Sequence, residues 1–238
     1  MSSERGLRGA LFGLALLLGL DAQAGVTAER TRVVIAEGQR EASLLLVNQN
    51  AYPVIVQAWI DDGDLDSTPQ TARAPFMPLP PVFRLDPGKQ RSLRLLRTGQ
   101  ALPGDREALY WLNIYEIPPR PGEPPAEGQS RLTVTLRTQM KVIHRPRALA
   151  RAAEEAPRQL RFQRQGKALL VENPTAYFVS LAGAEQEDGA PLLSALLLAP
   201  FSRQMQAPGQ TLPSGKQAIR FHWLDDGGNL RQGRTALR

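Results

Sequence analysis

Short runs of apolar and β-branched residues recur along the chain, and polar turn residues separate them. In the first half these runs are 32–35, 42–47, 54–60, 82–85, 91–96 and 108–117. Asp86-Pro87-Gly88-Lys89 stands between two of them and predicts a β-turn, because the proline presets φ and the glycine tolerates a positive φ. Evenly spaced short strands with polar turns are typical of a β-sandwich.

The longest alternating segment spans residues 132–142. Its apolar residues share one face of a predicted strand: Leu132, Val134, Leu136, Met140 and Val142. The strand is longer than the usual five or six residues, and Pro146 ends it. Periodicity identifies this apolar face but not its partner, which is either the protein's own core or another protein. The proline-rich segment 118–130 before it predicts a loop between antiparallel strands.

The second half of the chain repeats the β pattern after an interruption. Residues 147–157 are rich in alanine and charge and stand between Pro146 and Pro157, so we interpret them as a linker and the start of a second domain. Further strands are predicted at 160–164, 168–172, 177–181, 192–198 and 218–223. The pattern predicts an all-β protein of two sandwich domains, residues 25–147 and 148–238.

The N-terminus predicts a secretory signal peptide over residues 1–24. Arg5 and Arg8 precede an apolar run from Ala10 to Leu20, and Ala22-Gln23-Ala24 places small residues two apart, as signal peptidase requires. The run is about half of the roughly 20 residues that span a bilayer. We therefore expect an exported protein that is not embedded in the membrane.

Composition removes several classes of function. The 238 residues include no cysteine and only two histidines, His144 and His222, which excludes thiol chemistry and zinc–thiolate sites and leaves no multi-histidine metal site. The net charge of +6 comes from arginines spread along the chain, so we expect no nucleic-acid partner. The acidic run 62–66 does not match a calcium-binding loop. The glycine expected at the sixth loop position is absent, and Arg73 stands where the bidentate glutamate should be. We expect no enzyme, no cofactor and no metal.

Residues 102–118, LPGDREALYWLNIYEIP, resemble the signature of the periplasmic chaperones that assemble pili through the chaperone/usher pathway. Ala108 departs mildly from it, since the family more often has serine, threonine or arginine there. Four further segments match in the same order: 29–35, 80–88, 138–146 and 172–177. The resemblance covers nearly the whole chain after the predicted signal peptide.

This resemblance implies two immunoglobulin-like domains set at an angle with a cleft between them. It implies that Arg32 and Lys141 bind the C-terminal carboxylate of a pilus subunit in that cleft, and that strand 132–142 completes the subunit's open sheet. Leu132, Val134 and Leu136 occupy the positions that fill the subunit's hydrophobic groove. The implied partners are pilus subunits and an outer-membrane usher, and the implied location is the periplasm.

Two further expectations follow from the resemblance. Glu107, Arg145 and Asp225 match charged residues that link the two domains in the family. The moderate length of the proline-rich loop resembles the short-loop class of these chaperones, which generally serves rod-like pili. The alternative is an exported binding protein with tandem immunoglobulin-like domains, such as an adhesin or a fibre component. The cationic pair beside an alternating strand favours the chaperone.

Overall fold

The computed structural model describes residues 25–120, 134–209, 212 and 217–238. The predicted signal peptide, Leu132 and most of the proline-rich segment lie outside the described residues. Within the described part of the chain, no helix is long and apolar enough to cross a membrane.

The first half of the chain forms a sandwich of two sheets. One sheet has the order β1-β3-β7-β5 and the other β2-β9-β8-β4-β6. The strands are β1 (Val26–Ala28), β2 (Arg32–Ala36), β3 (Glu41–Asn48), β4 (Val54–Asp61), β5 (Phe76–Leu79), β6 (Val82–Leu85), β7 (Gln90–Arg97), β8 (Ala108–Ile117) and β9 (Leu136–Arg145). Alternate residues of the facing sheets, such as Leu44, Leu93 and Val142, are buried between them as the period-2 pattern requires.

The second half forms a smaller sandwich. Its sheets are β10-β11-β15 and β13-β12-β16-β17, with β14 also paired to β12. Two 3₁₀ turns, η1 (Arg147–Leu149) and η2 (Ala156–Gln159), precede its strands. These are β10 (Arg161–Gln165), β11 (Ala168–Asn173), β12 (Val179–Gln186), β13 (Pro191–Leu193), β14 (Leu196–Leu198), β15 (Ser202–Gln206), β16 (Ala218–Leu224) and β17 (Leu230–Ala236). Phe221 packs between Phe162 and Trp223 in its core.

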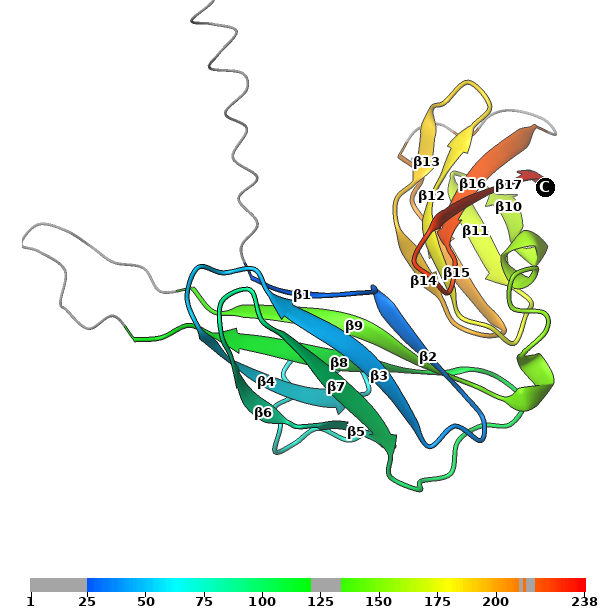
Figure 1. Ribbon diagram of the computed structural model, residues 1–238. Helices are drawn as coiled ribbons and strands as arrows, with labels where there is room; N and C mark the ends of the chain where they lie inside the picture. Colours follow the sequence, from blue (N-terminus) through cyan, green and yellow to red (C-terminus); the bar gives the residue numbers. More distant parts are fainter. Residues whose placement is uncertain (1–24, 121–133, 210–211, 213–216) are drawn as a thin grey trace, which may run out of the picture.

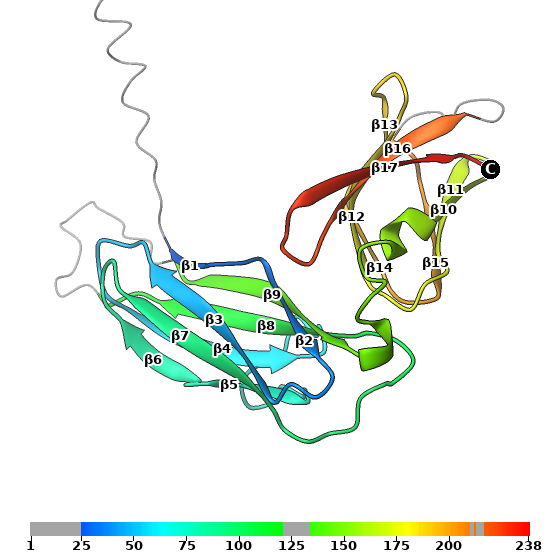
Figure 2. The same ribbon diagram turned by 45° about the vertical axis from the view of Figure 1, so that its right-hand side comes forward.

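The two sandwiches meet at an angle, and the segment with η1 and η2 connects them on the outer side of the bend (Figures 1 and 2). A cavity of about 570 Å³ lies between them and is lined by residues of both. The predicted all-β fold with two angled sandwich domains is confirmed.

The long predicted strand begins later than expected and ends where expected. The alternating segment predicts a strand over 132–142 with Pro146 ending it, whereas β9 runs from Leu136 to Arg145. Near its C-terminal end, β2 pairs with residues 141–145 in parallel while β8 pairs along the other side in antiparallel. This two-sided hydrogen bonding holds the strand as far as Pro146, which has no N–H to continue the ladder.

Candidate functional site

The pairing of β2 with β9 brings the two predicted anchor residues together. Arg32 lies opposite Lys141 in the parallel register. Their neighbours Val33 and Val142 point into the core of the first sandwich. Because side chains alternate along a strand, Arg32 and Lys141 share the outer face of the sheet, and at Arg32 this face meets the second sandwich.

Arg32 reaches across to the second domain and is only 5% exposed. Its Nη1 donates to the carbonyl oxygen of Leu224 at 3.2 Å and to Oγ of Ser180 at 3.4 Å. Its buried Nε has no hydrogen-bond partner. Burial lowers the pKa of Arg32 because it disfavours the cation, and the charges of Asp226 and Asp225 offset part of that shift. The guanidinium therefore retains a donor for a further acceptor.

Lys141 is partly buried, and its Nζ lies 5.2 Å from the centre of the Trp111 ring. Burial and then the nearby charge of Arg32 lower the pKa of Lys141. Two cations held side by side in a partly desolvated place favour an anion between them, since an opposite charge relieves both penalties. A carboxylate fits the chemistry of both, as a forked partner for the guanidinium and a point-charge partner for the ammonium.

The cavity between the domains opens beside Arg32. Its wall also includes Arg145, Tyr177, Trp223 and Asp226. Residues of the linker and of the turn between β16 and β17 complete it. An extended peptide end that entered here would contact both domains and Arg32.

The apolar face of β9 changes character along its length. Val134, just before the strand, is 58% exposed and Leu136 is 47% exposed, whereas Met140 and Val142 are 4% and 0% exposed. In the free protein, Val134 and Leu136 are therefore not buried in the domain's own core, whereas Met140 and Val142 are. Leu132, the third predicted groove-filling residue, lies outside the described residues.

The backbone of β9 also changes along its length. Residues 136–144 pair with β8, but β2 pairs only with residues 141–145. Among the described residues, 136–140 thus have a paired neighbour on one side only. An open strand edge presents unpaired N–H and C=O groups to another chain.

A charged network connects the domains beside this site. Nε of Arg145 donates to Oε1 of Glu107 at 2.6 Å, and its two Nη atoms donate to the carboxylate of Asp226 at 2.5 and 2.9 Å. The backbone N–H of Phe178 donates to Oε2 of Glu107 at 2.7 Å. Burial raises the pKa of Glu107, although Arg145 opposes the shift.

The prediction of Asp225 as the second domain's partner in this network is wrong. Asp225 accepts hydrogen bonds from the backbone N–H of Asn229 at 2.9 Å and from Nε of Arg231 at 2.8 Å, so it closes the β16–β17 turn. The adjacent Asp226 faces Arg145 instead. The sequence Asp-Asp-Gly-Gly contains both carboxylates, and only the path of the turn determines which one points at the other domain.

The comparisons with known proteins agree with this geometry. Residues 25–150 match the model of the N-terminal domain of the pili and flagellar-assembly chaperone PapD, and residues 155–235 match the C-terminal domain of the pili assembly chaperone PapD. The chain belongs to the PapD family of pili assembly chaperones. The chaperone protein FimB/FhaD of Bordetella pertussis is 34% identical to it over 98% of both chains.

Solved structures resemble this chaperone over most of its length. The Pseudomonas aeruginosa CupB2 chaperone is 31% identical, with a TM-score of 0.73 over 89% of this chain and 100% of its own. The Salmonella enterica SafB chaperone, solved in complex with the SafA pilin, is 30% identical, with a TM-score of 0.78 over 90% of this chain and 97% of its own.

Membership of this family confirms the predicted location and function. This protein is a periplasmic chaperone of pilus assembly, and proteins of the family are not enzymes. The prediction of a pilus-assembly chaperone is confirmed over the alternative of an adhesin or fibre component.

Sequence reasoning missed two residues of the candidate site. Asp226 could not be distinguished in the sequence from the adjacent Asp225. Trp111, which lies opposite Lys141 in the β8–β9 register, supports the ammonium with its ring. Its place on the odd-numbered face of the signature strand was a usable signal, but only the register with β9 connects it to Lys141. His144 is buried near the end of β9.

Proposed function

We propose that this chaperone holds pilus subunits by donating residues 132–142 as a β-strand. The observation that supports this proposal is that Val134 and Leu136 are exposed at the start of a strand whose edge is open at residues 136–140. An added strand can satisfy the edge of an incomplete sheet, while its alternate side chains enter the sheet's groove. The SafB chaperone in complex with a pilin provides the family precedent.

The apolar side chains supply the driving force in this proposal. Burying a side chain of the size of valine or leucine contributes about 1.5–3 kcal/mol. Val134 and Leu136 begin from exposed positions, so most of that gain is available on binding. Leu132 is a third side chain of this size in the proposed segment. The sum is reduced by the entropy of association, which makes a second anchor valuable.

We propose that Arg32 and Lys141 provide that anchor by binding the subunit's C-terminal carboxylate. Lys141 lies five residues beyond Leu136 along β9, and Arg32 lies beside it on β2, so one subunit can contact both features. A carboxylate between two partly buried cations is bound far more strongly than in an exposed ion pair, which contributes about 0–1 kcal/mol.

Four further inferences concern the domain boundaries, the usher, the loop class and the interdomain charges. We infer a domain division at 25–147 and 148–238 and delivery of the subunit to an outer-membrane usher. We also infer membership of the short-loop class, supported by the modest length of the proline-rich segment in the sequence. Glu107, Arg145 and Asp226 set the angle between the domains, so that the anchor and the donated strand face one subunit.

Co-expression with the pilus subunits of the same bacterium tests the anchor. We expect the wild-type chaperone to yield a soluble one-to-one complex and Lys141→Ala to reduce its yield at least tenfold. Lys89→Ala is the matched control, because Lys89 is an exposed lysine of the β6–β7 turn in the same domain. Wild-type yield from Lys141→Ala would remove the carboxylate anchor. Subunits that are stable without any chaperone would remove the proposed function itself.

A further inference from the structure

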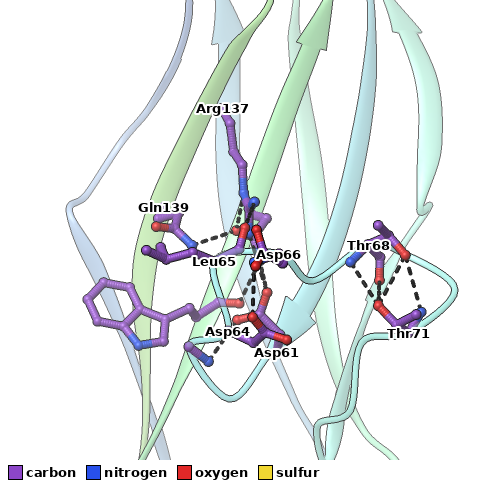
Figure 3. A network of polar contacts seen from close by, with 11 residues as sticks. Asp61, Asp64, Leu65, Asp66, Thr68, Thr71, Arg137 and Gln139 are labelled. Atoms are coloured by element: carbon purple, nitrogen blue, oxygen red, sulfur yellow. Dashed lines mark hydrogen bonds and ion pairs between the residues drawn. The ribbon is translucent and has the colours of Figure 1, made fainter.

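The face of β9 opposite Leu136 carries a polar cluster that the proposed subunit contacts do not use. We define the Arg137 cluster as Asp61, Asn113, Arg137, Gln139 and the backbone carbonyl of Leu65. Nε of Arg137 donates to Oδ1 of Asn113 at 2.8 Å, and Nη1 donates to the carbonyl oxygen of Leu65 at 2.7 Å (Figure 3). A side chain of β9 is thereby tied to β8 and to the loop after β4.

The base of the Arg137 cluster is a buried carboxylate. Asp61, at the end of β4, is 1% exposed. It accepts hydrogen bonds from Nδ2 of Asn113 at 2.7 Å and from the backbone N–H of Gly63 at 2.9 Å. Nη2 of Arg137 lies 3.6 Å from its Oδ2. A buried carboxylate is costly without a cation nearby, so Asp61 draws Arg137 to this place.

Further contacts restrict the same stretch of β9. The guanidinium of Arg137 lies 5.0 Å from the centre of the Trp59 ring, on β4. Nε2 of Gln139 donates to the same Oδ1 of Asn113 at 2.9 Å. Both outward side chains between Leu136 and Met140 are thus bonded to neighbouring strands, in the stretch where β2 does not pair with the backbone.

The acidic loop also acquires a function in this arrangement. Asp64 accepts the N–H of Asp66 at its side chain and that of Ser67 at its carbonyl. These bonds form a compact turn that presents the carbonyl of Leu65 to Arg137 (Figure 3). The acidic run 62–66 does not match a calcium loop. Its turn instead supplies a backbone acceptor for the guanidinium of Arg137.

We infer that Arg137 is a positioning residue that holds residues 136–140 of β9 extended before a subunit arrives. This inference rests on the proposed strand donation. A strand with one paired edge must otherwise be ordered during binding, at an entropic cost that preorganisation removes. The planar, forked guanidinium is suited to this task, because it bonds Asn113 and Leu65 at once while it faces Asp61.

Hydrogen exchange of the free protein tests the inference with Arg137→Lys. The lysine keeps a cation beside Asp61, so the domain should fold, but it lacks the fork. We expect amides of residues 136–140 to exchange at least fivefold faster, with those of 141–145 unchanged. Arg94→Lys is the matched control, since Arg94 is an exposed arginine in the other sheet of this domain, 3.6 Å from Glu41. We expect it to leave both segments as in wild type.

A second readout separates this inference from the proposed function. Subunit recovered from the wild-type complex is denatured and diluted into each variant, and the rate of complex formation is measured. We expect a rate at least threefold slower with Arg137→Lys and a wild-type rate with Arg94→Lys. Failure of the wild-type chain to capture subunit would sink strand donation alone. Wild-type exchange at 136–140 in Arg137→Lys, or equal acceleration throughout the domain, would overturn the positioning role.

Discussion

At the scale of single residues, the free protein tolerates an electrostatic penalty at the proposed anchor, Arg32 and Lys141. Arg32 and Lys141 are neighbours of like charge, and burial and their mutual repulsion lower the pKa of Lys141. The ammonium has the Trp111 ring beside it in the described structure. We therefore expect the pair to contribute little to folding and to be stabilised when an anion binds.

Lys141→Met should therefore leave the free protein as stable as wild type, or more stable, with a change below about 1 kcal/mol. The methionine keeps the contact with Trp111 and removes the repulsion. In wild type the folded state binds fewer protons than the unfolded state between the lowered pKa of Lys141 and its ordinary value, so the free energy of unfolding rises with pH through that window. The variant should lack this rise. Denaturant unfolding at several pH values measures it, and a loss above about 2 kcal/mol would indicate a structural role instead.

At the scale of the element, β9 has two halves with different surroundings. Its C-terminal half is paired on both edges and contributes to the core, whereas its N-terminal half has one paired edge and an exposed apolar face. The apolar face of β9 thus stabilises the chaperone's own core at Met140 and Val142, and it is exposed at Leu136.

Leu136→Ala should reduce subunit capture and Met140→Ala should reduce stability, although both truncate the same face of β9. Leu136→Ala should change the free energy of unfolding by less than about 0.5 kcal/mol, because the side chain is exposed, and should reduce subunit capture several-fold. Met140→Ala should cost about 2–5 kcal/mol because it leaves a cavity in the core. Urea unfolding and co-purification measure the two effects. Equal stability losses would contradict the division of the strand.

At the scale of the whole molecule, contacts near the bend hold the two sandwiches together. Arg145 links Glu107 to Asp226, and the backbone N–H of Glu107 also donates to the carbonyl of Ala176 at 2.9 Å. On the segment before β8, the guanidinium of Arg106 lies 5.3 Å from the centre of the Phe201 ring of the second domain. Together these contacts restrain the relative orientation of the domains.

Asp226→Asn should loosen this orientation, while Asp225→Asn should not. The amide at 226 loses the charged fork with Arg145, which weakens the link between the domains by about 1–2 kcal/mol for a partly exposed pair. Asp225 bonds only within its own turn among the described contacts, which makes it a matched neighbour. Small-angle X-ray scattering should show a broader distribution of shapes for the first variant alone. The same distribution for both variants would contradict the assignment of Asp226.

The sequence by itself determined the fold class and most of the strands, although β1, β5, β15 and β17 were not predicted. Period-2 alternation and turn residues predicted an all-β chain, and the collinear motifs identified a pilus chaperone together with Arg32 and Lys141. Local pattern suffices here, because alternation and turn preference act between residues close in the chain. Segment 192–198 marks the limit of that approach: it reads as one strand, yet it forms β13 and β14 with a break between them.

Only the tertiary structure decided which residues meet. The parallel register of β2 and β9 places Arg32 beside Lys141, the end of that pairing at Lys141 leaves 136–140 with an open edge, and the path of one turn selects Asp226 over Asp225. The cluster around Arg137 joins β4, β8 and β9 in the same way. Pairing and turn direction depend on contacts between distant segments, so a pattern along the chain can identify a face but not what it faces.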